Sequence, residues 1–155
     1  MKNFKKYLTY FFIGMSVLFL IALFSSRYIL NTYVSKLSKS QVTETTKDSL
    51  ITTINKTFNY TQNGKPYRIT FLEFGSKGCS ACRKMEEVMA EVKTKYPDKV
   101  NVIFLNILIP ENQPMSQYFG IAQIPTQVLL NEQGKEFFRH SGYLSFEELQ
   151  KQLLR

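Results

Sequence analysis

Residues 69–82 read ITFLEFGSKGCSAC, an apolar run followed by a short glycine-containing loop and two cysteines. The run 69–74 is rich in aromatic and β-branched residues and has the length of a buried strand. From Ser80 to about Tyr96 the pattern is helical, and Pro97 ends it after an apolar stripe of Met85, Val88, Met89 and Val92. The stretch therefore predicts a strand, a tight loop and a helix that begins at the two cysteines.

Cys79 and Cys82 are separated by two residues, which places them one helical turn apart at the helix start. Side chains at i and i+3 share a helix face, so small adjustments bring the two sulfurs within bonding distance. The free N–H groups and the dipole of a helix N-terminus stabilise a thiolate. We therefore predict that Cys79 is the low-pKa nucleophile that attacks a substrate disulfide, and that Cys82 is the resolving thiol.

Two other interpretations of the cysteine pair stay open on these residues alone. A zinc site needs two further ligands, and the only histidine, His140, lies in a predicted hairpin strand. The pair can also form a plain structural disulfide. A C-x-x-C between a strand and a helix favours redox chemistry, and we predict no metal site and no cofactor.

Glu73 is the only acid in the apolar strand and precedes Cys79 by six residues. Buried acids are rare unless they are paired or functional, and desolvation raises the pKa of such a carboxyl. We expect Glu73 to lie beneath the cysteines and to carry the proton of Cys82 through the exchange. The alternative is a glutamate at the strand end that faces solvent.

Helices and strands alternate along the rest of the chain. Before the first strand, a helix with Asp48 or Ser49 as its N-cap carries Leu50, Ile51, Ile54 and Phe58 at helical intervals. A second buried strand at 100–108 and a short helix ending near Phe119 come next. Strands joined through helices predict parallel pairing.

The C-terminal part predicts a hairpin and a last helix. The hairpin joins strands at 126–130 and 135–140 and adds an antiparallel edge. Ser145 caps an amphipathic helix whose inward side chains are predicted to be Phe146, Leu149, Leu153 and Leu154. Pro125 opens the first hairpin strand directly after Ile124, a place that suits a cis peptide bond, although a trans proline can also start an edge strand.

Together these residues resemble the thioredoxin family over about residues 47–155. The resemblance is carried by the C-x-x-C, the stretch 119–126 (FGIAQIPT), Gly134, and Gly142 with Leu144-Ser145. The resemblance implies an α/β thioredoxin fold, a central mixed sheet flanked by helices with a βαβαββα core. It implies that Glu73 is the family's buried carboxylate. It further implies that Pro125 is a cis-proline packed against the redox pair, and that Ile124 and Pro125 bind the backbone of a substrate strand.

Four residues depart from the pattern of that family. Gly78 stands where an aromatic residue usually precedes the first cysteine, and Ser80-Ala81 replaces Gly-Pro. Phe104 occupies the stretch of strand where a lysine often accompanies the buried acid. The reduction potential and the substrate preference therefore do not follow from the resemblance.

Residues 7–26 carry no charge and are mostly apolar. As a helix they span about 30 Å, the thickness of the hydrocarbon core of a bilayer. A cleaved signal peptide has a shorter apolar run and a small-residue cleavage site, so we favour an uncleaved transmembrane helix. Lys2, Lys5 and Lys6 then place the N-terminus in the cytoplasm and the domain beyond the cytoplasmic (inner) membrane, in the periplasm or outside the cell.

The sequence thus predicts three parts: a cytoplasmic N-terminus with an anchor at 1–26, a juxtamembrane linker at 27–46, and a thioredoxin-like domain at 47–155. The linker is rich in Ser and Thr, but Leu30, Tyr33, Val34 and Leu37 keep helical spacing. A continuation of the anchor helix and a flexible tether are both compatible with this pattern.

The charge balance argues against a nucleic-acid partner. The formal net charge is +8, and without Lys2, Lys5 and Lys6 the remaining 17 basic residues exceed the 12 acidic ones by five. These basic residues are scattered among acids rather than gathered on one face. We predict a membrane-anchored thiol–disulfide oxidoreductase that reduces disulfides of extracytoplasmic proteins, resembling bacterial extracytoplasmic thioredoxins, with a membrane electron-donor protein as a second partner. The alternatives are a disulfide oxidase and a thioredoxin-fold binding module without redox turnover.

Overall fold

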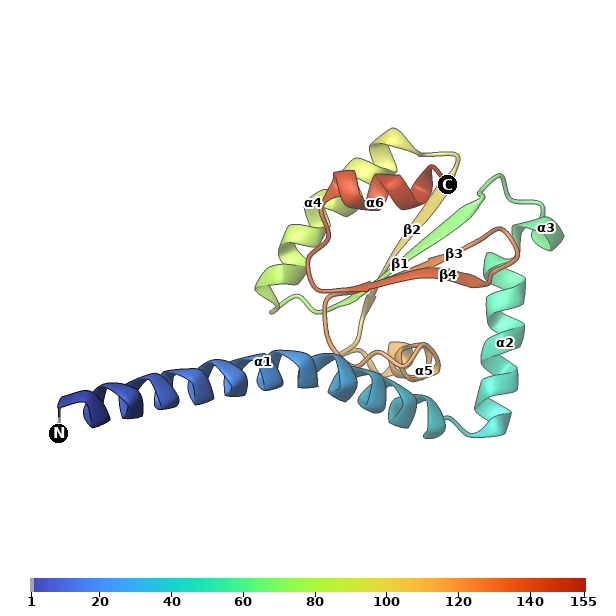
Figure 1. Cartoon of the computed structure of the whole chain (residues 1–155). Coiled ribbons are helices and arrows are strands. Elements are labelled where there is room, and N and C mark those ends of the chain that lie inside the picture. Colours follow the sequence, from blue (N-terminus) through green and yellow to red (C-terminus); the bar gives the residue numbers. More distant parts are fainter. Residues whose placement is uncertain (1) are drawn as a thin grey trace.

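The computed structural model describes residues 2–155, with side chains described except at 2–5, 9 and 24–28. Met1 and the side chains of Lys2 and Lys5, on which the predicted membrane orientation partly rests, lie outside the described residues. The elements in chain order (Figure 1) are α1 (Lys2–Ser40), α2 (Glu44–Phe58), α3 (Tyr60–Asn63), β1 (Ile69–Gly75), α4 (Ser80–Lys95), β2 (Val100–Asn106), the 3-10 turn η1 (Pro110–Asn112), α5 (Gln113–Tyr118), β3 (Thr126–Leu130), β4 (Glu136–Ser141) and α6 (Phe146–Leu153).

The four strands form one mixed sheet in the order β2-β1-β3-β4. β1 pairs with β2 in parallel, from Ile69 opposite Val100 to Gly75 opposite Asn106. β3 pairs antiparallel with both β1 and β4. The predicted mixed sheet and hairpin are confirmed, but parallel pairing of every helix-connected strand was wrong for β3. After β2 the chain turns back through the short α5, and this places β3 antiparallel beside β1.

Two apolar cores lie on the two faces of the sheet, because successive strand side chains point to opposite faces. On one face α4 and α6 cover Ile69, Phe71 and Leu129. On the other face α2 and α5 cover Leu72, Phe74, Val128 and Leu130. Figure 1 shows the same layers, with α4 and α6 together on one side of the sheet and α2 and α5 on the other. The odd-numbered positions of β1 therefore face α4.

Helix α1 runs unbroken from Lys2 to Ser40, so the helical alternative for the juxtamembrane segment is the one observed. The stretch Lys6–Leu23 is long and apolar enough to cross a bilayer, and none of it is buried within the described structure; a signal sequence has the same properties. The division of the chain after residues 26 and 46 stays a prediction.

Some predicted details were wrong at the ends of elements. Thr43 is the N-cap of α2 in place of Asp48 or Ser49, because the helix starts at Glu44, earlier than its apolar pattern shows. The second strand ends at Asn106. Leu154 is 61% exposed because it follows the last turn of α6, whereas the predicted cap at Ser145 is confirmed by a full capping box with Glu148.

Candidate redox site

Cys79 is the N-cap residue of α4, as the sequence predicted. Its backbone is extended, and its Sγ accepts a hydrogen bond from the backbone N–H of Cys82 at 3.2 Å. The backbone N–H of Cys79 donates to Ser76 at 3.2 Å, which closes the turn between β1 and the helix. The first sulfur therefore lies among the N–H groups at the positive end of a 16-residue helix, where a thiolate is stabilised.

Cys79 and Cys82 form a disulfide, with their Cα atoms 5.2 Å apart. The two cysteines differ in exposure, because Cys79 is half-buried and Cys82 is only 1% exposed. An incoming substrate disulfide can therefore reach Cys79 but not Cys82. This asymmetry fits an attacking thiol at the surface and a resolving thiol behind it.

Gly75, at the end of β1, lies directly against the buried cysteine. A Cβ at this glycine would meet the Phe104 ring at 2.9 Å and the Cβ and Sγ of Cys82 at 3.3 Å. Only a glycine therefore lets Cys82 and Phe104 close over the strand end. The sequence predicted Gly75 to begin the loop after the strand and gave no sign of its place in the site, because the close approach comes from packing between elements.

Glu73 is fully buried on β1, two residues before Gly75 and thus on the same face of the strand. Since the Cβ direction of Gly75 points at Cys82, the Glu73 side chain lies on the face that the buried sulfur covers. Burial raises the pKa of Glu73 to about 8, and a hydrogen bond from Gln127 partly opposes this rise. The alternative of a solvent-facing glutamate was wrong.

Gln127 is the neighbour of Glu73 on β3, and it is also fully buried. Its Nε2 donates to Glu73 Oε1 at 3.4 Å and to the carbonyl oxygen of Gly142 at 3.1 Å. Glu73 Oε2 and Gln127 Oε1 have no hydrogen-bond partner among the described residues. A buried carboxyl with one free oxygen can take up and release a proton with little rearrangement. Gln127 was missed because its contact depends on strand register, not on a local motif.

The Ile124–Pro125 peptide bond is cis, as predicted, and Pro125 is buried. Its carbonyl oxygen accepts a hydrogen bond from the backbone N–H of Gly142 at 2.8 Å. Thr126, the next residue, pairs with Phe74 at the end of β1. The cis-proline segment and the cysteines therefore meet at the same end of the sheet.

His140, the predicted lone histidine, lies in β4, where its Nε2 donates to the carbonyl oxygen of Tyr143 at 3.2 Å. Within residues 2–155 no three His, Cys, Asp or Glu side chains gather closely enough to hold a metal ion. The reactive groups that the structure brings to this end of the sheet are the two sulfurs and the buried carboxyl of Glu73.

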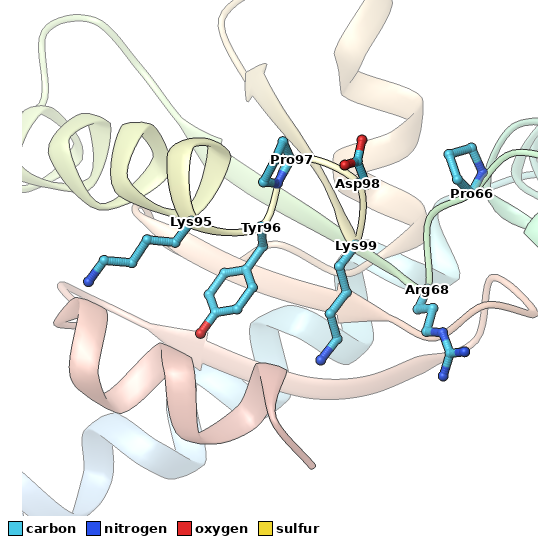
Figure 2. Close-up of a pocket in the computed structure, with 7 residues that line it drawn as sticks. All are labelled: Pro66, Arg68, Lys95, Tyr96, Pro97, Asp98 and Lys99. Atoms are coloured by element: carbon cyan, nitrogen blue, oxygen red, sulfur yellow. The ribbon is translucent and has the colours of Figure 1, made fainter.

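A separate hollow of about 490 Å³ lies at the opposite end of the sheet, lined by Pro66, Arg68, Lys95, Tyr96, Pro97, Asp98 and Lys99. Figure 2 shows Lys95 and Tyr96 extending from the end of α4 toward α6. There Lys95 pairs with Glu91 at 2.8 Å and lies 4.2 Å from the centre of the Phe146 ring. Lys95 thus helps to pack α4 against α6, away from the cysteines.

Comparison with known proteins agrees with this geometry. A family model described as "Thioredoxin-like domain" matches residues 55–155, about two thirds of the chain. The chain belongs to the thioredoxin-like family. Membership in this family, together with the Cys79–Cys82 disulfide, supports thiol–disulfide oxidoreductase activity.

Individual relatives of this thioredoxin-like chain match its domain only in part. The chloroplastic thioredoxin-like protein HCF164 of Arabidopsis thaliana is 32% identical over 74 residues, which are 48% of this chain and 27% of that protein. The chain thus spans about a quarter of the length of the curated relatives it matches.

Solved structures share the fold of the chain. Thioredoxin NaTrxh of Nicotiana alata is 28% identical, with a TM-score of 0.51, 68% of this chain and 81% of that chain covered. Oxidised thioredoxin O2 of Arabidopsis thaliana is 18% identical, with a TM-score of 0.53, 70% of this chain and 86% of that chain covered. The second of these likenesses shows the fold alone.

Proposed function

We propose that this protein is a membrane-anchored thiol–disulfide oxidoreductase that reduces disulfides of extracytoplasmic proteins. The observation that carries the proposal is the pairing of a half-buried Cys79 at a helix N-terminus with a buried Cys82, above a buried Glu73 whose pKa is raised to about 8. A structural disulfide needs neither the helix N-terminus nor the buried acid.

The proposed cycle transfers two electrons and two protons from the dithiol to the substrate. The Cys79 thiolate attacks one sulfur of the substrate disulfide, forms a mixed disulfide and releases the first substrate thiol. The Glu73 carboxylate then takes the proton of Cys82, and the Cys82 thiolate attacks the Cys79 sulfur. The second substrate thiolate leaves and takes from Glu73 the proton that came from Cys82, and Cys79 and Cys82 are left as the disulfide. A dithiol of a membrane electron-donor protein returns the enzyme to its reduced form.

Ile124 and Pro125 are the proposed substrate-binding segment. Pro125 is buried and Ile124 is partly exposed, and both lie at the same end of the sheet as the cysteines. Proline has no N–H, so the backbone groups that can pair with an extended substrate segment are those of Ile124. This pairing would align the substrate disulfide with the Cys79 sulfur.

The proposed anchor is the uncharged segment 7–26, within the helix that is long and apolar enough to cross a bilayer. The lysines ahead of it favour a cytoplasmic N-terminus and a domain in the periplasm. The reducing direction is proposed because a reductant outside the cytoplasm gains from being held near a membrane electron donor. The reducing direction is tested by measuring the reduction potential of the Cys79–Cys82 pair, which should be strongly negative. A reduction potential well above that of glutathione would indicate an oxidase.

Trapping of mixed disulfides tests the enzyme. Cys82→Ser should accumulate mixed disulfides with its substrates through Cys79, whereas Cys79→Ser, the matched control, should accumulate none. If Cys82→Ser traps no more than Cys79→Ser, the redox function is wrong and a binding module remains. Protease digestion of the domain in spheroplasts tests its location, and digestion only after lysis would contradict the periplasmic placement.

A further inference from the structure

The C-terminal part of α1 packs on the domain beside the segment that leads to the cis-proline. Asn31 Nδ2 donates a hydrogen bond to Gln123 Oε1 at 3.0 Å. One turn further along, a Cβ on Gly120 would meet Ser35 Oγ at 2.6 Å and Lys39 Cε at 2.8 Å, so the helix lies directly against this glycine. Gly120 also has a φ of +62°, which disfavours any other residue. The helix is therefore fitted to the domain.

The direction of α1 along the domain follows from two hollows. Asn31 and Ser35 line a hollow of about 590 Å³ with Thr126 and Ser141, the start of β3 and the end of β4. Lys39 lines another of about 440 Å³ with Glu136, the start of β4. Helix α1 therefore runs antiparallel to β4, so that the residues of α1 nearer its N-terminus lie beside the end of β4.

The redox centre lies at the end of the domain that this direction reaches. β4 is antiparallel to β3, and β3 is antiparallel to β1, so β1 runs the same way as β4 and ends at Gly75, against Cys82. Figure 1 agrees: the turn between β1 and α4 lies toward the N-terminal half of α1, whereas α2 and α3 lie on the far side. The cysteines therefore face the direction from which α1 arrives.

The distance between this end and the apolar stretch is short. Asn31 is eight residues beyond Leu23, the end of the apolar stretch, which corresponds to about 12 Å of helix. A headgroup layer takes up about 5–8 Å of that distance. Only about 5 Å then remains, whereas a globular domain of about 100 residues has a radius of gyration near 13 Å. The part of the domain beside Asn31 therefore lies close to the membrane surface, which leaves little room there for a folded soluble partner.

Three exposed apolar side chains lie at the same end of the sheet, at its two edges. Leu108 is 69% and Ile109 43% exposed in the loop after β2, which runs parallel to β1. Tyr143, 49% exposed, follows the end of β4. Exposed apolar side chains around a reactive centre are typical of a protein-binding surface.

We infer that the docked part of α1 turns the dithiol toward the bilayer, and that the substrate is a disulfide of a membrane-embedded protein, held at the membrane surface against Leu108, Ile109 and Tyr143. This inference rests on the proposed anchor and dithiol exchange. The substrate disulfide is reduced to two thiols while Cys79 and Cys82 are oxidised to the disulfide, so two electrons and two protons pass to the membrane protein.

The orientation is tested with the full chain in phosphatidylcholine vesicles. In a Cys79→Ser, Cys82→Ser background, Lys77→Cys or Lys135→Cys is labelled with a fluorophore, and a headgroup-attached spin label serves as quencher. Both lysines are exposed, but Lys77 follows β1 and Lys135 lies beside the start of β4, about 20 Å apart along the sheet. We expect several-fold stronger quenching at position 77. Equal quenching, or stronger quenching at position 135, overturns the inferred orientation even if the enzyme reduces disulfides. If the chain does not float with the vesicles, both the proposed anchor and this inference are wrong.

The substrate class is tested by moving the domain away from the bilayer. Seven alanines inserted between Ser26 and Arg27 add two helical turns, about 10 Å, and keep the docked face in register. The probes are a synthetic transmembrane peptide with a disulfide just outside its apolar stretch, and insulin as a soluble disulfide. The insertion should slow reduction of the peptide about tenfold or more, and it should speed reduction of insulin, because the added 10 Å makes room for a soluble partner.

Equal reduction of the membrane peptide by the insertion variant overturns the inferred substrate class, whereas loss of both activities in the wild-type chain overturns the proposed function itself. Leu108→Ser with Ile109→Ser should likewise slow only the peptide. If this pair of changes alters quenching at position 77 but not peptide reduction, the loop contacts lipid and the inferred protein-binding surface is wrong.

Discussion

Replacing Glu73 by glutamine should change how the stability of the protein depends on pH. Burial raises the pKa of Glu73 from 4.5 to about 8, so the folded chain holds this proton more tightly than the unfolded chain. The stabilisation is complete below pH 4.5 and is lost as the pH rises through 8. The free energy of unfolding should fall by about 1.4 kcal/mol per pH unit in this window, which is roughly 3 kcal/mol by pH 7 and about 5 kcal/mol above pH 8.

The assay is urea unfolding of the oxidised full chain in a non-ionic detergent, from pH 4 to pH 9. Glu73→Gln has no titrating carboxyl here, so its stability relative to the wild-type chain should rise by roughly 3 kcal/mol between pH 4 and pH 7. Glu86→Gln, the same change at an exposed position of α4, should give no such rise. Parallel stability curves for Glu73→Gln and the wild-type chain would refute the reasoning, because Glu73 would then ionise like an exposed acid.

Three further changes test the site. Gln127→Leu removes the hydrogen bond that lowers the pKa of Glu73, so the infrared band of the protonated carboxyl should persist to higher pH than in the wild-type chain; an unchanged midpoint would mean that Gln127 does not act on Glu73. Gly75→Ala places a Cβ 2.9 Å from the Phe104 ring and should cost about 1–3 kcal/mol of unfolding free energy, whereas Gly78→Ala, with open space around it, should cost much less. In the reduced chain, iodoacetamide should modify Cys79 well before Cys82, because Cys82 is only 1% exposed; faster labelling of Cys82 in mass spectra would contradict the assigned roles.

The features that were predicted correctly are those that depend on a pattern of neighbouring residues in the sequence. The strand at 69–74, the helix that starts at Cys79, the cis bond before Pro125 and the cap at Ser145 each depend on a local pattern, and all are confirmed. The burial of Glu73 was also predictable, because a strand of apolar residues is covered on both faces and an acid within it is buried with its neighbours. In each case the physical cause lies within a few residues of its effect.

The features that were wrong or missed depend on how distant elements meet. Periodicity identifies β3 as a strand but does not say which neighbour it pairs with or in which direction. Gln127 becomes part of the site only because the register sets it opposite Glu73, 54 residues away. Gly75 matters because Phe104 and Cys82 close over it from two other elements. None of these contacts leaves a signature in a short stretch of sequence.

The unbroken course of α1 would make the proposed membrane anchor a rigid arm that also sets the orientation of the domain. A transmembrane helix whose apolar length differs from the thickness of the surrounding bilayer tilts to compensate for the mismatch. Because α1 continues as one helix to Ser40 and packs against Gly120, the described residues contain no break between the proposed anchor and the domain that would absorb such a tilt. Lipid composition would then set the angle at which the dithiol meets its substrate, so that a thicker or thinner bilayer changes the exchange rate without touching any residue of the site.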